Sequence, residues 1–113
     1  MARESWAYRD VAVESAIDPR SGRVIIRPVS GQAYATSLRV HCARALSDPE
    51  RYPVGTRFLL SAKLTDRQGG EPYLYAWHGD PVVVMTKAAV KRFVEERRRL
   101  RICRLRGVDV VEG

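Results

Sequence analysis

The chain has 113 residues, of which 45% are apolar and 8% aromatic, and its 20 lysines and arginines against 13 acidic residues give a formal charge of +7. A chain of this length buries roughly two thirds of its unfolded surface, which is enough for one core and excludes two separate ones. No run of about 20 apolar residues is present, as a membrane-spanning helix requires, and residues 1–8 lack the apolar stretch of a secretory signal. We expect a cytoplasmic single-domain protein spanning 1–113, with no membrane partner.

The excess charge is concentrated near the C-terminus. Residues 87–106 contain nine basic and two acidic side chains, whereas the rest of the chain contains eleven of each. Such asymmetry is typical of a protein with an anionic partner, above all nucleic acid. Arginine outnumbers lysine 17 to 3, so a compositional bias of the gene is an alternative explanation.

The first half of the chain predicts short strands separated by turns. A strand is expected within 6–17, a turn at 18–22, and a returning strand that starts at Val24 and stops at Pro28, because proline cannot donate a ladder hydrogen bond. A third strand is predicted over 34–42, with Leu38, Val40 and Cys42 on one face and Arg39 and His41 on the other.

Further strand signals follow a loop rich in turn-forming residues at 47–55. Residues 43–46 are ambiguous between strand and a short helical turn. The clearest strand is 56–65, followed by a hairpin connection at 66–71, a partner strand at 72–77 and a short apolar strand at 82–85 that suits a buried position. Within 56–65 the predicted buried face consists of Phe58, Leu60, Ala62 and Leu64.

After Thr86, a plausible N-cap, the pattern changes to a helix over 86–102. Its apolar stripe is formed by Ala89, Val90, Phe93, Val94 and Leu100. Residues 103–113 are expected to be a tail or an extra strand. The predicted fold class is therefore α+β with β dominant: about five short antiparallel strands forming a small barrel or curled sheet over 1–85, with the basic helix packed on it.

Tyr73, Tyr75 and Trp77 alternate in the partner strand and would form an aromatic row on one face. Such rows stack unpaired bases, and basic neighbours such as Arg57 and Lys63 supply phosphate contacts. This interpretation requires both cations to share the face of the row, which the sequence does not fix. The alternative is that the row packs under the helix as core.

No catalytic or metal site is predicted, and no cofactor. The inventory of His41, Cys42, His78 and Cys103 lacks the paired spacing of a zinc site, and adjacent strand residues point to opposite faces. No phosphate-binding loop is present, since Gly69-Gly70 is not followed by Lys-Ser/Thr. We expect both cysteines to be free thiols and Cys42 to be a small core residue.

The leading hypothesis is a non-catalytic nucleic-acid-binding module that uses the arginine-rich helix for phosphate contacts. The alternative is a small protein-interaction or assembly subunit, a homodimer or an adaptor, and a small-ligand-binding barrel is a third option. The predicted nucleic-acid contacts are Arg57, Lys63, Tyr73, Tyr75, Trp77, Lys91, Arg92, Arg97, Arg98, Arg99 and Arg101.

Overall fold

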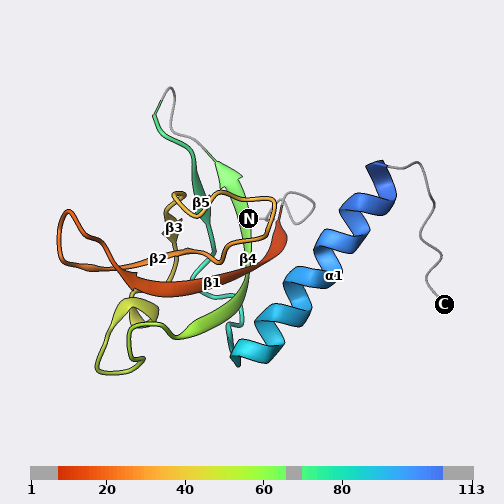
Figure 1. Ribbon diagram of the computed structural model, residues 1–113. Helices are drawn as coiled ribbons and strands as arrows, with labels where there is room; N and C mark the ends of the chain where they lie inside the picture. Colours follow the sequence, from red (N-terminus) through yellow and green to blue (C-terminus); the bar gives the residue numbers. More distant parts are fainter. Residues whose placement is uncertain (1–7, 66–69, 106–113) are drawn as a thin grey trace.

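The computed structural model describes residues 8–65 and 70–105, with side chains as far as Leu100. A mixed six-stranded sheet carries one C-terminal helix (Figure 1). The elements are β1 (Arg9–Ile17), β2 (Val24–Pro28), β3 (Val40–His41), a 3₁₀ turn (Arg44–Ser47), β4 (Arg57–Thr65), β5 (Tyr73–Tyr75), β6 (Val83–Met85) and α1 (Lys87–Leu105). The α+β class with β dominant is confirmed.

The strands run in the order β2-β1-β4-β5-β3, with β6 paired to β4 beyond the end of β5. The prediction of an all-antiparallel sheet is wrong, because β3 and β5 are parallel. The sheet curls but does not close, because β2 and β3 form its two ends and are not paired with each other. A side-chain ion pair at 3.0 Å links Arg39, just before β3, to Asp18 in the turn between β1 and β2. A barrel is therefore not formed.

The core fills the concave face of this curl. Val11 and Val13 of β1 and Phe58 of β4 have no exposed surface, and Val13 lies directly opposite Phe58 in the ladder. The alternation predicted for β4 is confirmed except at its end, where Leu64 is 53% exposed because the strand extends past the core. The core residues are Val11, Val13, Ile26, Val40, Leu46, Phe58, Leu60, Ala62, Leu74 and Ala76.

The third predicted strand is mostly wrong, since only Val40 and His41 pair and residues 29–39 form a loop. Tertiary hydrogen bonds explain this. The Gln32 side chain binds the backbone of Ala12 twice, accepting from its N–H at 2.9 Å and donating to its carbonyl at 2.7 Å. Gln32 thus replaces a strand neighbour along β1. Leu38 and Cys42 still pack against the core, and Arg39 and His41 face solvent, as predicted.

The remaining turns follow local sequence, with two corrections. The ambiguous stretch after Ala43 forms the 3₁₀ turn, and 48–56 is a loop. Strand β6 is present, but its predicted burial is wrong: Val83 and Val84 are 56% and 55% exposed. The cause is position, because β6 borders β4 at an outer edge of the sheet and no element of the described chain covers it. The predicted hairpin connection falls mainly on 66–69, outside the described residues.

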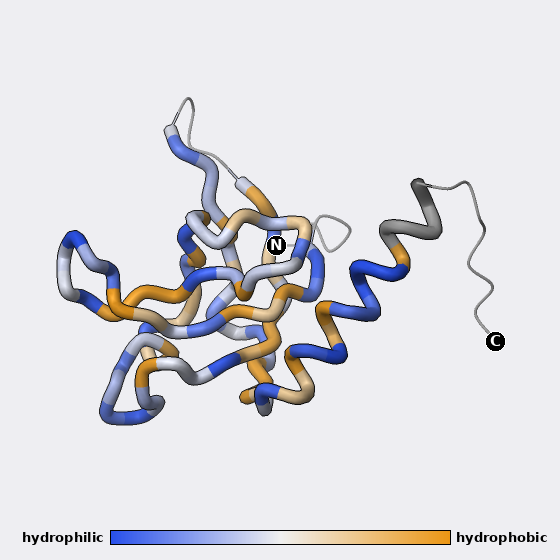
Figure 2. Tube along the Cα trace, viewed as in Figure 1, coloured by the Kyte–Doolittle hydropathy of each residue, from blue (hydrophilic) through white to orange (hydrophobic). Residues whose placement is uncertain are grey.

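Helix α1 begins after Thr86, whose hydroxyl accepts from the N–H of Ala89 at 3.1 Å, so the predicted N-cap is confirmed. The helix ends at Leu105 instead of near 102. Only its first turns dock: Val90 is 4% exposed, whereas Leu100 is 37% exposed and is not part of a buried stripe. Beyond those turns α1 diverges from the sheet (Figure 1), and hydrophilic residues dominate it (Figure 2).

A glycine allows the helix to dock. Gly31 has a φ of +93°, and a Cβ placed there would lie 2.8 Å from Cγ1 of Val94. This close approach seats α1 on the 29–39 loop. In residues 8–65 and 70–105, no helix combines the length and the apolar character needed to span a bilayer. Of the tail or extra strand predicted over 103–113, residues 103–105 instead belong to α1, and 106–113 lie outside the described residues.

Candidate nucleic-acid interface

The aromatic residues of β5 lie on the convex face of the sheet, away from the core. Leu74 and Ala76 are buried in the core, whereas Tyr73 and Tyr75 are half-buried on the opposite face. The alternative in which the row packs as core under the helix is therefore wrong for these two tyrosines. Trp77 follows the strand, is 44% exposed, and its ring lies over Gly79.

The two predicted strand cations share this convex face. Lys63 is the direct cross-strand partner of Tyr75, and Tyr75 is in turn the partner of His41 in β3. Because directly opposite residues point to the same side of a sheet, His41, Tyr75 and Lys63 form one row across three strands. The rings of His41 and Tyr73 stack with centroids 4.3 Å apart, and the Lys63 ammonium lies 5.8 Å from the Tyr8 ring.

Arg57 is on the same face of β4 as Lys63, six residues earlier. At about 3.3 Å per residue, the two cations are about 20 Å apart along the strand. Arg57 is therefore remote from the tyrosines. It lies instead near the start of α1, because its ladder partner is Met85, just before the helix.

The cations of α1 fall into two groups. Lys91, Arg92, Arg98 and Arg99 are exposed. Arg97 is engaged with the body: its guanidinium contacts Asp10 at 3.5 Å and lies 5.2 Å from the centroid of the Phe93 ring. Arg97 is thus partly engaged with the body, and its contact with nucleic acid stays a prediction. The side chain of Arg101 lies outside the described part of the chain.

A cleft of about 570 Å³ separates the N-terminal half of α1 from the sheet. Arg57 and Lys91, two of the predicted contacts, line it together with Arg27 and Lys87, which the sequence reasoning did not select. Arg27 donates to Glu14 at 3.3 Å. Arg27 was missed because its sequence neighbours are apolar, and only the pairing of β2, β1 and β4 places it beside Arg57.

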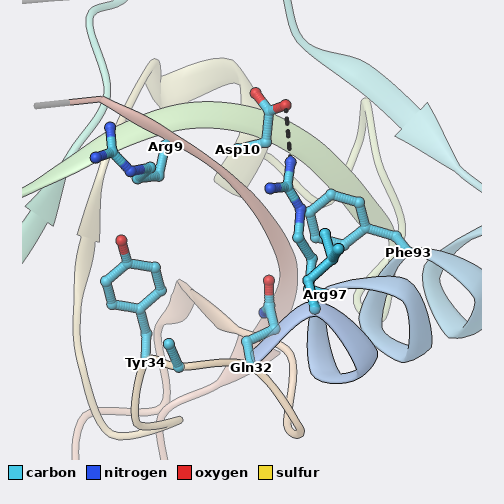
Figure 3. A pocket seen from close by; sticks show the side chains of 8 residues that line it. Arg9, Asp10, Gln32, Tyr34, Phe93 and Arg97 are labelled. Atoms are coloured by element: carbon cyan, nitrogen blue, oxygen red, sulfur yellow. Dashed lines mark hydrogen bonds and ion pairs between the residues drawn. The ribbon is translucent and has the colours of Figure 1, made fainter. Parts of the chain in front are cut away.

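A smaller hollow of about 260 Å³ lies beside the exposed half of α1 (Figure 3). Arg9 and Asp10 come from β1, Gln32 and Tyr34 from the loop, and Phe93 and Arg97 from α1. Its charged groups are largely engaged locally: Arg97 reaches Asp10, and Arg9 donates to the carbonyl of Tyr8 at 3.0 Å. This hollow therefore helps to hold the helix and offers little charge to a ligand.

Among the described residues, two titratable groups have shifted pKa values. Burial raises the pKa of Cys42 to about 11, so the thiol stays protonated at neutral pH and is a poor nucleophile. The pKa of Asp18 is lowered, first by the backbone N–H of Arg20 and then by the Arg39 guanidinium. Across the described residues, no three metal-ligating side chains gather in one place.

Comparison of the chain with protein-family models, with curated proteins and with solved structures gives no significant match.

Proposed function

We propose that this protein is a non-catalytic nucleic-acid-binding module whose convex face stacks unpaired bases and contacts phosphates. The observation that carries the proposal is the row of His41, Tyr75 and Lys63 across β3, β5 and β4, on the face turned away from the core. An aromatic ring flanked by a cation across the strand is the combination that single-stranded nucleic acid requires.

The type of nucleic acid follows from the aromatic side chains. Tyr73 and Tyr75 can offer ring faces only to bases that are not enclosed in a duplex. Base stacking of this kind contributes about 1–3 kcal/mol for each base, whereas phosphate contacts supply affinity that weakens with salt. The exposed cations Lys91, Arg92, Arg98 and Arg99 of α1 can extend the phosphate contacts.

The test is fluorescence anisotropy with labelled oligo(dT) and oligo(rU) of 12 nucleotides across a salt series. If about five phosphates of a single strand are neutralised, log K should fall against log salt with a slope of about −3.5. Tyr75→Ala should weaken binding about 5- to 150-fold, which is the loss of one stacked base.

Tyr75→Phe keeps the ring and is the matched control, so it should bind within about twofold of the wild type. A flat salt response, or equal affinities for Tyr75→Ala and Tyr75→Phe, would contradict the proposal. Binding of duplex DNA more tightly than of either single strand would also contradict it.

A second candidate, a small protein-interaction or assembly subunit, is favoured by β6. Val83 and Val84 are exposed on this edge strand, and Val82 is exposed just before it. Exposed apolar side chains on an edge strand favour pairing with another strand. Sedimentation of the wild type and of Val83→Lys separates this candidate from the first. A homodimer that Val83→Lys dissociates, together with no oligonucleotide binding, supports it.

A further inference from the structure

The cleft between α1 and the sheet gathers positive charge from three elements. Arg27 comes from β2, Arg57 from β4, and Lys87 and Lys91 from α1, whereas Glu14 and Glu95 are its two carboxylates. The lining thus has an excess of two positive charges. These cations are between 4 and 64 positions apart in the chain, so the fold, and not a local charge run, brings them together.

Among the described residues, only one of the four cations is in an ion pair with a carboxylate. Glu14 is bound by Arg27 at 3.3 Å. Arg57 is the ladder partner of Glu14, yet among the described residues no carboxylate lies within ion-pair distance of Arg57, Lys87 or Lys91. Arg57 is also half-buried. Like charges close together in a partly desolvated cleft repel one another, and a bound anion removes that cost.

The cleft has the shape and the donors for a phosphoryl group. Its volume of about 570 Å³ is within the usual range for small-ligand sites, and Val29, Val90 and Val94 give it apolar walls. Ser30 and Thr36 add hydroxyl donors. An arginine fork binds two phosphate oxygens at once, and lysines add point charges. The first turn of α1, which starts at Lys87, adds the positive end of the helix dipole.

We propose that this cleft is a phosphate-binding site formed by Arg57, Lys87, Lys91 and Arg27. The ligand is a phosphoryl group, either a terminal phosphate of a small molecule or an internal phosphate of a nucleic-acid strand. The site goes beyond the proposed function, because Tyr73, Tyr75 and Lys63 do not line the cleft. Lys63 is about 20 Å from Arg57 along β4, and the two tyrosines lie beside Lys63 on β5.

The test is an NMR titration of the ¹⁵N-labelled full chain with inorganic pyrophosphate. We expect saturable shift changes confined to the residues that line the cleft. Arg57→Gln, and the double variant Lys87→Gln with Lys91→Gln, should each weaken binding about tenfold or more, since each removes charge-assisted hydrogen bonds. Arg57→Lys should recover part of the loss, which shows that charge at this position matters and not only the fold.

The control is Arg44→Gln with Arg51→Gln, which removes two exposed charges outside both the cleft and the proposed nucleic-acid contacts. It should change pyrophosphate affinity less than about twofold, because charges remote from the cleft act on the ligand only through solvent and are screened by salt. Glu95→Gln should strengthen binding, because it removes a carboxylate from the cleft wall. Non-saturable binding, or an equal loss in the control and the cleft variants, overturns the proposal.

A 12-nucleotide oligo(dT) without terminal phosphates separates the two sources of the phosphoryl group. If it displaces pyrophosphate from the cleft, the ligand is the strand backbone, and if it does not, the ligand is a terminal phosphate. The outcomes also separate this proposal from the function. If oligonucleotide binding depends on Tyr75 but pyrophosphate causes no shift changes in the cleft residues, only the proposed phosphate site in the cleft is contradicted. Pyrophosphate binding without oligonucleotide binding contradicts only the nucleic-acid function.

Discussion

Strand β1 and helix α1 differ in how deeply they are buried. In β1, the consecutive residues Val11, Ala12 and Val13 have no solvent-exposed surface. In the described part of α1, Val90 is the most buried residue, and every side chain from residue 95 to Leu100 is exposed. Strand β1 is central to the sheet, with β2 on one side and β4 on the other. The helix contacts the body mainly through its first turns and through the Arg97–Asp10 ion pair.

This difference shows that the sheet provides most of the buried apolar surface, whereas α1 carries most of the excess positive charge. The curled sheet holds the hydrophobic core, and residues 1–86, which contain it, carry eleven basic and nine acidic side chains. The helix adds little burial but carries most of the excess positive charge. A helix with this role can place its cations beside the sheet without compromising the core, and the cleft at its N-terminal half is where the two regions meet.

The largest expected effect is a cavity in the sheet. Phe58→Ala removes a fully buried ring that packs edge-on against Tyr52, so it should lower the free energy of unfolding by about 3–5 kcal/mol. Leu100→Ala, the matched change in the helix, should cost less than about 0.5 kcal/mol because that side chain is partly exposed. Urea unfolding measures both, and similar losses would contradict the division between sheet and helix.

The alkylation rate of Cys42 measures how well the protein excludes water from this thiol. Because burial raises its pKa to about 11, its thiolate fraction at pH 8 should be about a hundredfold below that of a free cysteine, and alkylation should slow by that factor. The raised pKa also means that this group stabilises the fold fully below about pH 9 and that its contribution is lost as pH rises toward 11. Iodoacetamide kinetics in a Cys103→Ser variant test it. Alkylation of Cys42 at the rate of a free cysteine would show that water reaches this thiol and that its pKa is not raised.

The junction between helix and body depends on Gly31. Gly31→Ala places a Cβ against Val94 at a φ of +93°, so it should destabilise the protein by about 1–3 kcal/mol and displace α1. Gly55→Ala is the matched control. Gly55 has a φ of +99° and no atom within 4 Å of an added Cβ, so this variant has the backbone strain of a positive φ but no steric clash. Thermal unfolding compares the two. A Gly31→Ala loss no greater than that of Gly55→Ala would mean that the helix contact is not tight.

The smallest expected effect concerns the Arg97–Asp10 pair. Both side chains are about half exposed, at 46% and 55%, so Asp10→Asn should change the free energy of unfolding by less than about 1 kcal/mol. The change should shrink further in 1 M salt, because exposed charges are screened. Urea unfolding at low and high salt measures it, and a loss well above this range would show that the pair, and not the first turns, anchors α1.

Local sequence predicted most elements, because their signals are local. The alternation of β4, the stop at Pro28 and the cap at Thr86 depend on residue type and spacing alone. Two failures have tertiary causes. The stretch 34–42 alternates like a strand, but Gln32 occupies the edge of β1 beside it. The valines of β6 form an apolar run typical of a buried strand, yet that strand lies at an uncovered edge.

The candidate site divides in the same way. Residue type and spacing were enough to predict that Tyr73 and Tyr75 alternate in one strand, that Lys63 lies in the preceding one, and that positive charge is concentrated after Thr86. The three-dimensional fold was needed to show that Tyr75 shares a face with Lys63 and His41, and that Arg27 and Arg57 line one cleft with Lys87 and Lys91. The physical reason is register: strand pairing sets which distant residues share a face, and no local pattern encodes it.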